Sequence, residues 1–174
     1  GIDQDMTINE IGIAPRPLQD PHPPLYGGFT MSMKTALFWS QYGGTPIVLS
    51  DNLDFCEALW QTYREEAPRH GVEKPKGHEA AWGGIAVCAP TDLQAQQEFE
   101  DMEWFWDNWA RQFVQGMPLK LVGSPDTISR QIEEAHTRLG FDEVFFLIPQ
   151  GIHSSEQIIE SMDLITNQVM PRFT

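Results

Sequence analysis

The sequence predicts an α/β fold made of four successive strand–helix units with parallel strands. Four short and almost wholly apolar runs recur along the chain, and each is followed by a stretch with helical spacing of its apolar residues. Continuous apolar strands are typical of a parallel sheet that helices cover on both faces, or that closes into a barrel. Four strand–helix units are half of an eight-unit barrel, which typically takes about 250 residues or more, so this chain of 174 residues is predicted to be half of such a barrel.

The chain begins with a segment, residues 1–24, that we expect to be a connector leading into the first strand. Five prolines stand among the ten residues from Pro15 to Pro24. Proline fixes φ and donates no backbone hydrogen bond, so this segment is predicted to run extended over the surface. The folded domain is therefore predicted to cover residues 25–174.

The first two units follow directly. The mostly apolar run Leu25–Thr30 predicts a buried strand, and a helix-compatible stretch from Ser32 to Tyr42 follows it and ends at two glycines. The second unit begins with the β-branched strand Pro46–Ser50. Its helix, Leu53–Arg69, is amphipathic, because apolar residues recur at three- and four-residue spacing.

The third unit has the strand Trp82–Ala89 and a long acidic helix that Thr91 opens. Residues Gly116–Gly123 are predicted to form a connector. Ser124 and Pro125 then start another helix, because serine caps helices and proline suits the first helical position.

The fourth unit closes the chain. Its strand is predicted at Glu143–Ile148, after a glycine that ends the preceding helix. The last helix begins at Ser154 or Ser155, with Gln157 placed to complete a capping box, and extends to about Val169.

Composition narrows the function classes. The chain carries 11 basic and 25 acidic residues, a formal net charge of −14, which argues against a nucleic-acid partner because that affinity comes from Lys and Arg. No apolar run reaches the roughly 20 residues of a membrane span, and no signal peptide is recognisable, so we expect a cytoplasmic protein. The two cysteines, Cys56 and Cys88, have the spacing of neither a metal site nor a disulfide framework, and we expect no metal.

Several segments resemble one protein family. The run Pro15–Leu25 is similar to the entry into the second half of the bacterial luciferase-like flavin monooxygenases. Further segments resemble the same family in the same order: Trp39–Gly43, Pro46–Ser50, Tyr63 with Gly71, Gly140–Val144 through Glu160–Leu164, and Val169–Phe173. The resemblance extends from about residue 12 to residue 174.

The resemblance implies a TIM-barrel enzyme, of which this chain supplies the C-terminal half. It implies a monooxygenase that uses reduced FMN and O₂ to oxidise an apolar substrate of the aldehyde, alkane or ketone class. It also implies a flavin reductase as the source of reduced flavin, an N-terminal half-barrel in the same or a separate chain, and a dimer. In relatives the residues at the reactive edge of the flavin come from the first four strands, so no catalytic residue is assigned here.

One site of the family maps onto this chain. In relatives the flavin phosphate is bound just beyond the strand that follows the proline connector. The matching positions are Phe29, Thr30, Met31, Ser32 and Thr35, with Phe29 near the isoalloxazine edge. A helix N-terminus offers free N–H groups and a positive dipole end to an anion, and the hydroxyls add donors. The alternative is that Ser32 only caps the helix.

Three further residues are candidates for lining a substrate pocket. Asp51 and Trp82 lie at strand ends, and His153 lies on the loop after the last strand. The carboxyl ends of barrel strands are where such enzymes bind ligands. Asp51 could equally cap the next helix, and His153 could equally be an exposed loop histidine.

Other functions stay open at this point. One is a non-catalytic flavin-binding protein on a shortened barrel, and another is an oxidoreductase of the same superfamily that uses the deazaflavin F420. A third is a structural or interaction module without flavin. Flavin-dependent turnover would indicate an enzyme, and flavin binding without turnover would indicate a non-catalytic flavin-binding protein. Absence of flavin binding would indicate a structural or interaction module.

Overall fold

The structure is a computed structural model of the chain. It describes residues 4–7, 17–20, 22–28, 31–74, 77–113, 118–149 and 151–173. Within these ranges, residues 4–7, 17–20 and 22–25 contain neither helix nor strand, and the sheet begins at Tyr26.

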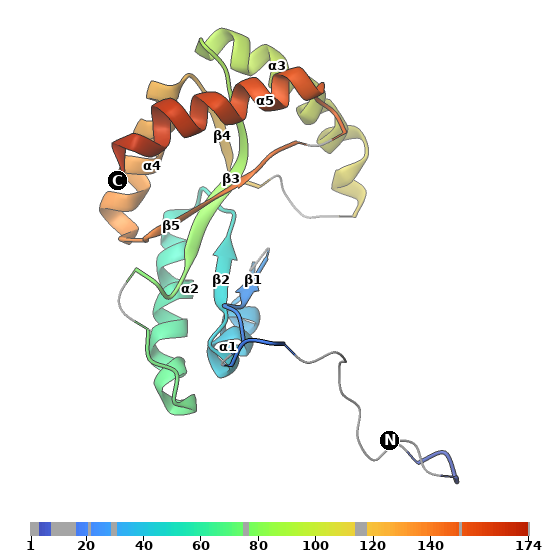
Figure 1. The fold of residues 1–174 in the computed structure, drawn as a ribbon, viewed down its shortest axis with the longest axis vertical. Helices are drawn as coiled ribbons and strands as arrows, with labels where there is room; N and C mark the ends of the chain where they lie inside the picture. The colour runs from blue at the N-terminus through green and yellow to red at the C-terminus, as the bar shows by residue number, and fades with distance from the viewer. Residues whose placement is uncertain are drawn as a thin grey trace.

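The described strands form one parallel sheet (Figure 1). They are β1 (Tyr26–Gly27), β2 (Thr45–Val48), β3 (Ala81–Cys88), β4 (Lys120–Gly123) and β5 (Glu143–Leu147). The apolar runs of the sequence predict four of these strands, namely β1, β2, β3 and β5. Where a predicted strand end falls on a described residue, the observed end lies within about two residues of it. The four predicted strands are confirmed as parallel strands, although β1 is not the buried strand expected, since Tyr26 is 46% exposed. With β4 added, the described residues form five strand–helix units and not four.

Strand β3 is the longest and pairs with three others. Its residues Ala81–Trp82 pair with β2, Ile85–Cys88 pair with β4, and Ala81–Ile85 pair with β5. Because β5 shares residues of β3 with both β2 and β4, it lies on the opposite edge of β3 from both of them. Strands β2 and β4 therefore follow one another along one edge, and the amide of Leu119 donates to the carbonyl of Leu49 where they meet (3.1 Å).

Strand β4 lies in the segment Gly116–Gly123, where the sequence predicts only a connector, so that prediction was wrong for residues 120–123. The strand is four residues long, and only its two central residues, Leu121 and Val122, are apolar and buried. So short a pattern does not distinguish a strand from a loop. It forms a strand because the long β3 offers its carboxyl half as a partner.

The helices begin where the sequence predicts. They are α1 (Met33–Tyr42), α2 (Leu53–Glu66), α3 (Asp92–Asn108), α4 (Pro125–Leu139) and α5 (Ser155–Leu164). Each has an N-cap side chain that accepts the amide of the residue three positions later; these caps are Ser32, Asn52, Thr91, Ser124 and Ser154. Short 3₁₀ turns follow α2 at Ala67–His70 and α3 at Ala110–Gln112. None of the described helices has the length and apolar character needed to cross a lipid bilayer.

The end of the chain differs from a simple helix. Helix α5 continues as a π-helical turn over Ile165–Val169 and then as a 3₁₀ turn over Met170–Arg172. The predicted end near Val169 is confirmed for the helical segment as a whole, although its last turns change hydrogen-bonding pattern.

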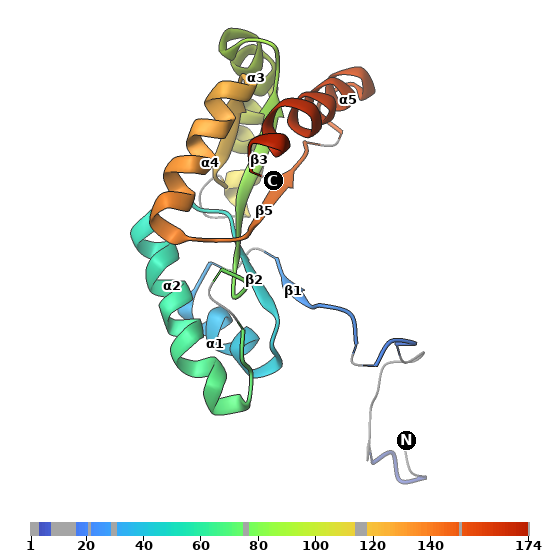
Figure 2. The same ribbon diagram turned by 60° about the vertical axis from the view of Figure 1, so that its left-hand side comes forward.

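Helices cover both faces of β3. Its even-numbered residues, such as Trp82 and Cys88, share one core cluster with residues of α2, α4 and the π-helical turn. Its odd-numbered residues Ile85 and Val87 pack with Phe99 of α3. Figure 2 shows α1 and α2 beside the amino end of β3, and α3, α4 and α5 beside its carboxyl end.

Candidate functional site

The N-terminus of α1 follows β1 at the carboxyl end of the sheet. Ser32 has extended backbone (φ −152°, ψ 151°), and its Oγ accepts the amide of Thr35 at 3.2 Å. The two hydroxyl oxygens of Ser32 and Thr35 lie 2.9 Å apart and share a hydrogen bond. The cap is therefore real, and the turn also brings two hydroxyl groups together at the helix end.

The charges of this turn suit an anion. The first turn of α1 contains no acidic residue, and it contains the exposed Lys34. The other four α-helices each carry a carboxylate there: Asp54 in α2, Asp92 in α3, Asp126 in α4 and Glu156 in α5. A carboxylate in the first turn satisfies the positive end of the helix dipole, whereas α1 leaves that end to another negative group. Two hydroxyls, helix amides and a lysine are donors that fit a phosphate.

Two of the five predicted flavin-contacting positions, Phe29 and Thr30, lie outside the described residues. Met31 is 52% exposed, immediately before Ser32. The structure thus brings Met31, Ser32 and Thr35 together at one helix end.

The predicted substrate-lining residues occupy three different settings. Asp51 is exposed, and Asn52, not Asp51, accepts the amide of Phe55 as the cap of α2. Trp82 is 2% exposed. Its Nε1 donates to the carbonyl of Ser50 at 3.1 Å, and its ring stacks on Phe141 at 5.3 Å. In this position Trp82 packs the core and joins β3 to the end of β2.

His153 links the loop after β5 to helix α3. Its Nε2 lies 2.8 Å from the backbone carbonyl of Glu98 on α3. A carbonyl only accepts hydrogen bonds, so Nε2 carries the hydrogen and Nδ1 is the nitrogen left for an acceptor role. The side chain is half-buried, so His153 is held in place and is not a freely exposed loop residue.

A hydrogen bond that the sequence did not reveal links two helices at the same end of the sheet. Asp92, in the first turn of α3, accepts the amide of Ser124 at 2.7 Å. This hydrogen bond lowers the pKa of the Asp92 carboxyl, with the side chains of Ser124 and Thr127 acting in the same direction. The start of α3 is thereby fixed to the start of α4. In the sequence, the only sign of this hydrogen bond is the position of Asp92 directly after the helix cap Thr91.

The opposite end of the sheet carries a second polar group of residues. Glu79 is 3% exposed and accepts a hydrogen bond from Arg64 at 2.6 Å. Lys74 donates to Thr45 at 2.6 Å, and burial lowers the pKa of its ammonium group. Burial also raises the pKa of Tyr63 to about 12. In α/β barrels the amino ends of the strands serve stability and the carboxyl ends carry the ligand sites, so we assign this group to stability.

The two thiols are not candidates for nucleophilic chemistry. Cys56 and Cys88 are 0% and 1% exposed. Burial raises the pKa of each thiol to about 11, so both stay protonated near neutral pH.

Comparisons with known proteins bear on the fold. No family model and no curated protein matches the sequence. Among solved structures, the monooxygenase RslO1 from Streptomyces bottropensis matches 92% of this chain with a TM-score of 0.74 at 17% identity. The FMN-bound oxygenating constituent of 3,6-diketocamphane monooxygenase from Pseudomonas putida, a type II Baeyer–Villiger enzyme, matches 88% with a TM-score of 0.71 at 19% identity.

The chain has the luciferase-like monooxygenase fold. It spans about half the length of these structures, 51% of RslO1 and 50% of the diketocamphane enzyme, which confirms the prediction of a partial barrel. The luciferase-like fold also occurs in the F420-dependent tetrahydromethanopterin reductase from Methanopyrus kandleri, which matches 87% of this chain with a TM-score of 0.56 at 17% identity.

Proposed function

We propose that this chain is the C-terminal half of a flavin-dependent monooxygenase. The whole enzyme would use reduced FMN and O₂ to place one oxygen atom into an apolar aldehyde, alkane or ketone and release the other as water. The observation that carries the proposal is the match to half of two monooxygenases with TM-scores of 0.74 and 0.71.

In this proposal the chain contributes the phosphate end of the flavin site. One of the hydroxyls of Ser32 and Thr35 would donate to the phosphate while the other donates within the pair, Lys34 would supply a positive charge, and the first amides of α1 would face the phosphate. Bound FMN, once reduced, supplies the electrons for the reaction with O₂. The residues Phe29, Thr30 and Met31, which lead into α1, are proposed to lie along the flavin.

The substrate pocket would draw on the same end of the sheet. Asp51 and His153 follow β2 and β5, and are proposed to face the mouth of the completed barrel. His153 would present Nδ1, since its Nε2 is engaged with Glu98. Trp82 is buried beneath this surface and would hold the carbonyl of Ser50 in place through its indole N–H. The proposal also includes a flavin reductase that supplies reduced flavin and a second half-barrel that completes the fold. We propose further that the enzyme is a dimer in the cytoplasm.

The test has two parts. FMN is titrated into the purified chain, alone and together with the polypeptide encoded immediately upstream, and binding is followed by quenching of flavin fluorescence. Reduced FMN, ¹⁸O₂ and a panel of apolar aldehydes, alkanes and ketones are then supplied, and products are analysed by mass spectrometry. We expect saturable binding and a product that contains one ¹⁸O atom. Absence of flavin binding in both samples overturns the proposal.

A second candidate function is an F420-dependent oxidoreductase, favoured by the fold match to the tetrahydromethanopterin reductase. The same titration with F420 in place of FMN distinguishes the two. Tighter binding of F420, with oxygen-independent turnover, would select this alternative.

A further inference from the structure

We propose that helix α5 and the open edge of β5 form a docking surface for a strand–helix unit whose helix presents Lys or Arg side chains. The inference rests on the proposed function, because that unit would belong to the remaining half of the barrel. It adds the chemistry by which the partner is recognised.

The first observation is the edge of β5. This strand pairs with β3 along one edge, and no strand pairs with the other edge in the part of the chain that the structure describes. Every residue of β3 is buried, whereas no residue of β5 is fully buried, and Phe145 is 39% exposed. An apolar strand with one unpaired edge is a template for a further strand.

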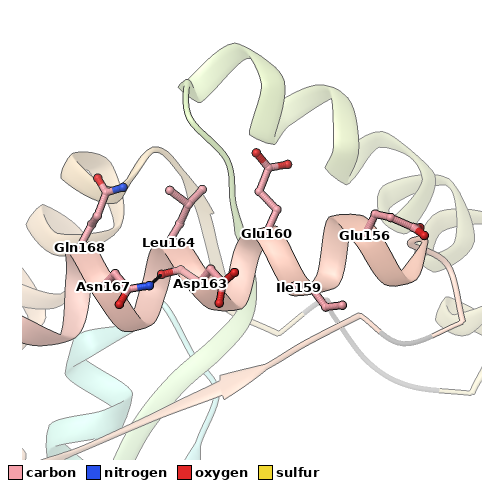
Figure 3. A pocket seen from close by; sticks show the side chains of 7 residues that line it. All are labelled: Glu156, Ile159, Glu160, Asp163, Leu164, Asn167 and Gln168. Carbon is pink, nitrogen blue, oxygen red and sulfur yellow. Dashed lines mark hydrogen bonds between the residues drawn. The ribbon is translucent and has the colours of Figure 1, made fainter.

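The second observation is the outer surface of α5, the helix that follows β5. A groove of about 550 Å³ runs along it. Its lining comprises Glu156, Ile159, Glu160, Asp163, Leu164, Asn167 and Gln168. Figure 3 shows Ile159 pointing toward the side of β5, while Glu160 points to the opposite side of the helix. Ile159 and Met162 are 58% and 50% exposed, so α5 keeps two large apolar side chains in contact with solvent.

The third observation is the charge of this groove. Glu156, Glu160 and Asp163 make no ion pair with any residue that the structure describes. Arg172, the basic residue at the end of the same segment, is engaged by Asp126 at 2.6 Å. The groove therefore combines the exposed Ile159 and the partly exposed Leu164 with three carboxylates that no described basic residue pairs with.

These features select the kind of partner. A second copy of this chain in a two-fold dimer would set the three carboxylates against their own equivalents, in a protein whose net charge is already −14. A basic helix compensates them, and the apolar residues beside them give it a surface to pack on. A strand joined to that helix would extend the sheet at β5. The occupant is therefore a strand–helix unit with a basic helix.

The experiment measures association of this chain with the polypeptide encoded immediately upstream, by calorimetry or biolayer interferometry. We expect a 1:1 complex whose Kd rises at least tenfold between about 0.05 and 0.5 M NaCl, since salt screens exposed charges. The double variant Glu160→Lys with Asp163→Lys is expected to raise Kd at least tenfold, because two attractive contacts become repulsive.

The matched control is Glu100→Lys with Asp101→Lys on α3, which makes the same charge change at two exposed positions. We expect its Kd within threefold of the wild type, and melting temperatures of both variants close to the wild type. A complex that is insensitive to the α5 variant, or sensitive to the α3 variant alone, overturns this inference and leaves the proposed function standing. Self-association through α5 or absence of any complex also overturns it, and the proposed function fails with it only if flavin binding is absent as well.

Discussion

The hydroxyl of Tyr26 on β1 donates a hydrogen bond to Oε1 of Glu143 on β5 at 3.2 Å, although 117 residues separate them in sequence. Strands β2 and β3 lie between β1 and β5 in the sheet. Two long side chains therefore reach toward each other across the two intervening strands, and their hydrogen bond links β1 to β5 directly.

This contact predicts a dependence of stability on alkaline pH. The hydrogen bond to the Glu143 carboxylate raises the pKa of Tyr26 above its ordinary value of 10.0. A group whose pKa is raised in the folded state stabilises that state below the unfolded pKa, and this contribution is lost as pH rises through the folded value. Because Tyr26 is 46% exposed, we expect Tyr26→Phe to cost less than about 1 kcal/mol.

Urea unfolding of wild type and Tyr26→Phe at pH 7 to 11 measures it. The two proteins are expected to converge above about pH 10. A double-mutant cycle with Glu143→Gln is the control, and additive effects of the two substitutions would show that the pair does not interact.

Asp92 predicts the opposite dependence. Its pKa is lowered by the amide of Ser124, so its stabilising effect is present above the ordinary value of 3.8 and is lost as pH falls through the folded value. We expect Asp92→Asn to be less stable than wild type at pH 6 and equal to it at the acid end of the transition. Equilibrium unfolding from pH 6 down to pH 2.5 checks this. A constant difference across that range would contradict the role of the carboxylate charge.

The N-terminus of α1 offers a variant that separates helix capping from phosphate binding. Thr35→Glu places a glutamate three residues after the cap Ser32, which is the capping-box pattern and favours the helix. The same carboxylate repels a phosphate. We expect the melting temperature to be unchanged or higher and the Kd for FMN to rise at least tenfold.

The matched control is Gln157→Glu, which places a glutamate at the equivalent position of the existing capping box of α5. Its FMN affinity is expected to equal that of the wild type. Unchanged FMN affinity in Thr35→Glu would show that the phosphate binds elsewhere.

Cys56 and Cys88 predict a simple chemical assay. Their thiols are buried, with pKa values raised to about 11. At pH 8 a disulfide reagent is expected to leave the native protein unmodified and to label two thiols per chain after denaturation. Rapid labelling of the native protein would show that α2, which carries Cys56, or β3, which carries Cys88, opens readily.

The sequence predicts those features that depend on neighbouring residues. The cap at Ser154 with Gln157, and the start of α4 at Ser124 and Pro125, are confirmed because capping depends on side chains within three residues. The long apolar run of β3 is equally clear, because eight consecutive buried residues leave few alternatives.

Features that depend on distant partners are not predictable in this way. Strand β4 exists because β3 lies beside it, and His153 is held by Glu98, 55 residues away. The same holds for Trp82, whose place at a strand end suggested a pocket, whereas its indole is enclosed between Ser50 and Phe141. A local sequence pattern predicts the helix or strand in which a residue lies, but not which residue distant in sequence will contact it.

The pairing of β3 with β2, β4 and β5 has a consequence for how the protein opens. Its amides lie in the middle of the sheet, with helices on both faces, so they can exchange with solvent only when most of the chain has separated. Hydrogen exchange in β3 therefore reports global unfolding, while β5, whose second edge pairs with no strand among the described residues, can exchange through local opening. A protease acting on the native protein would accordingly reach β5 long before it reaches β3.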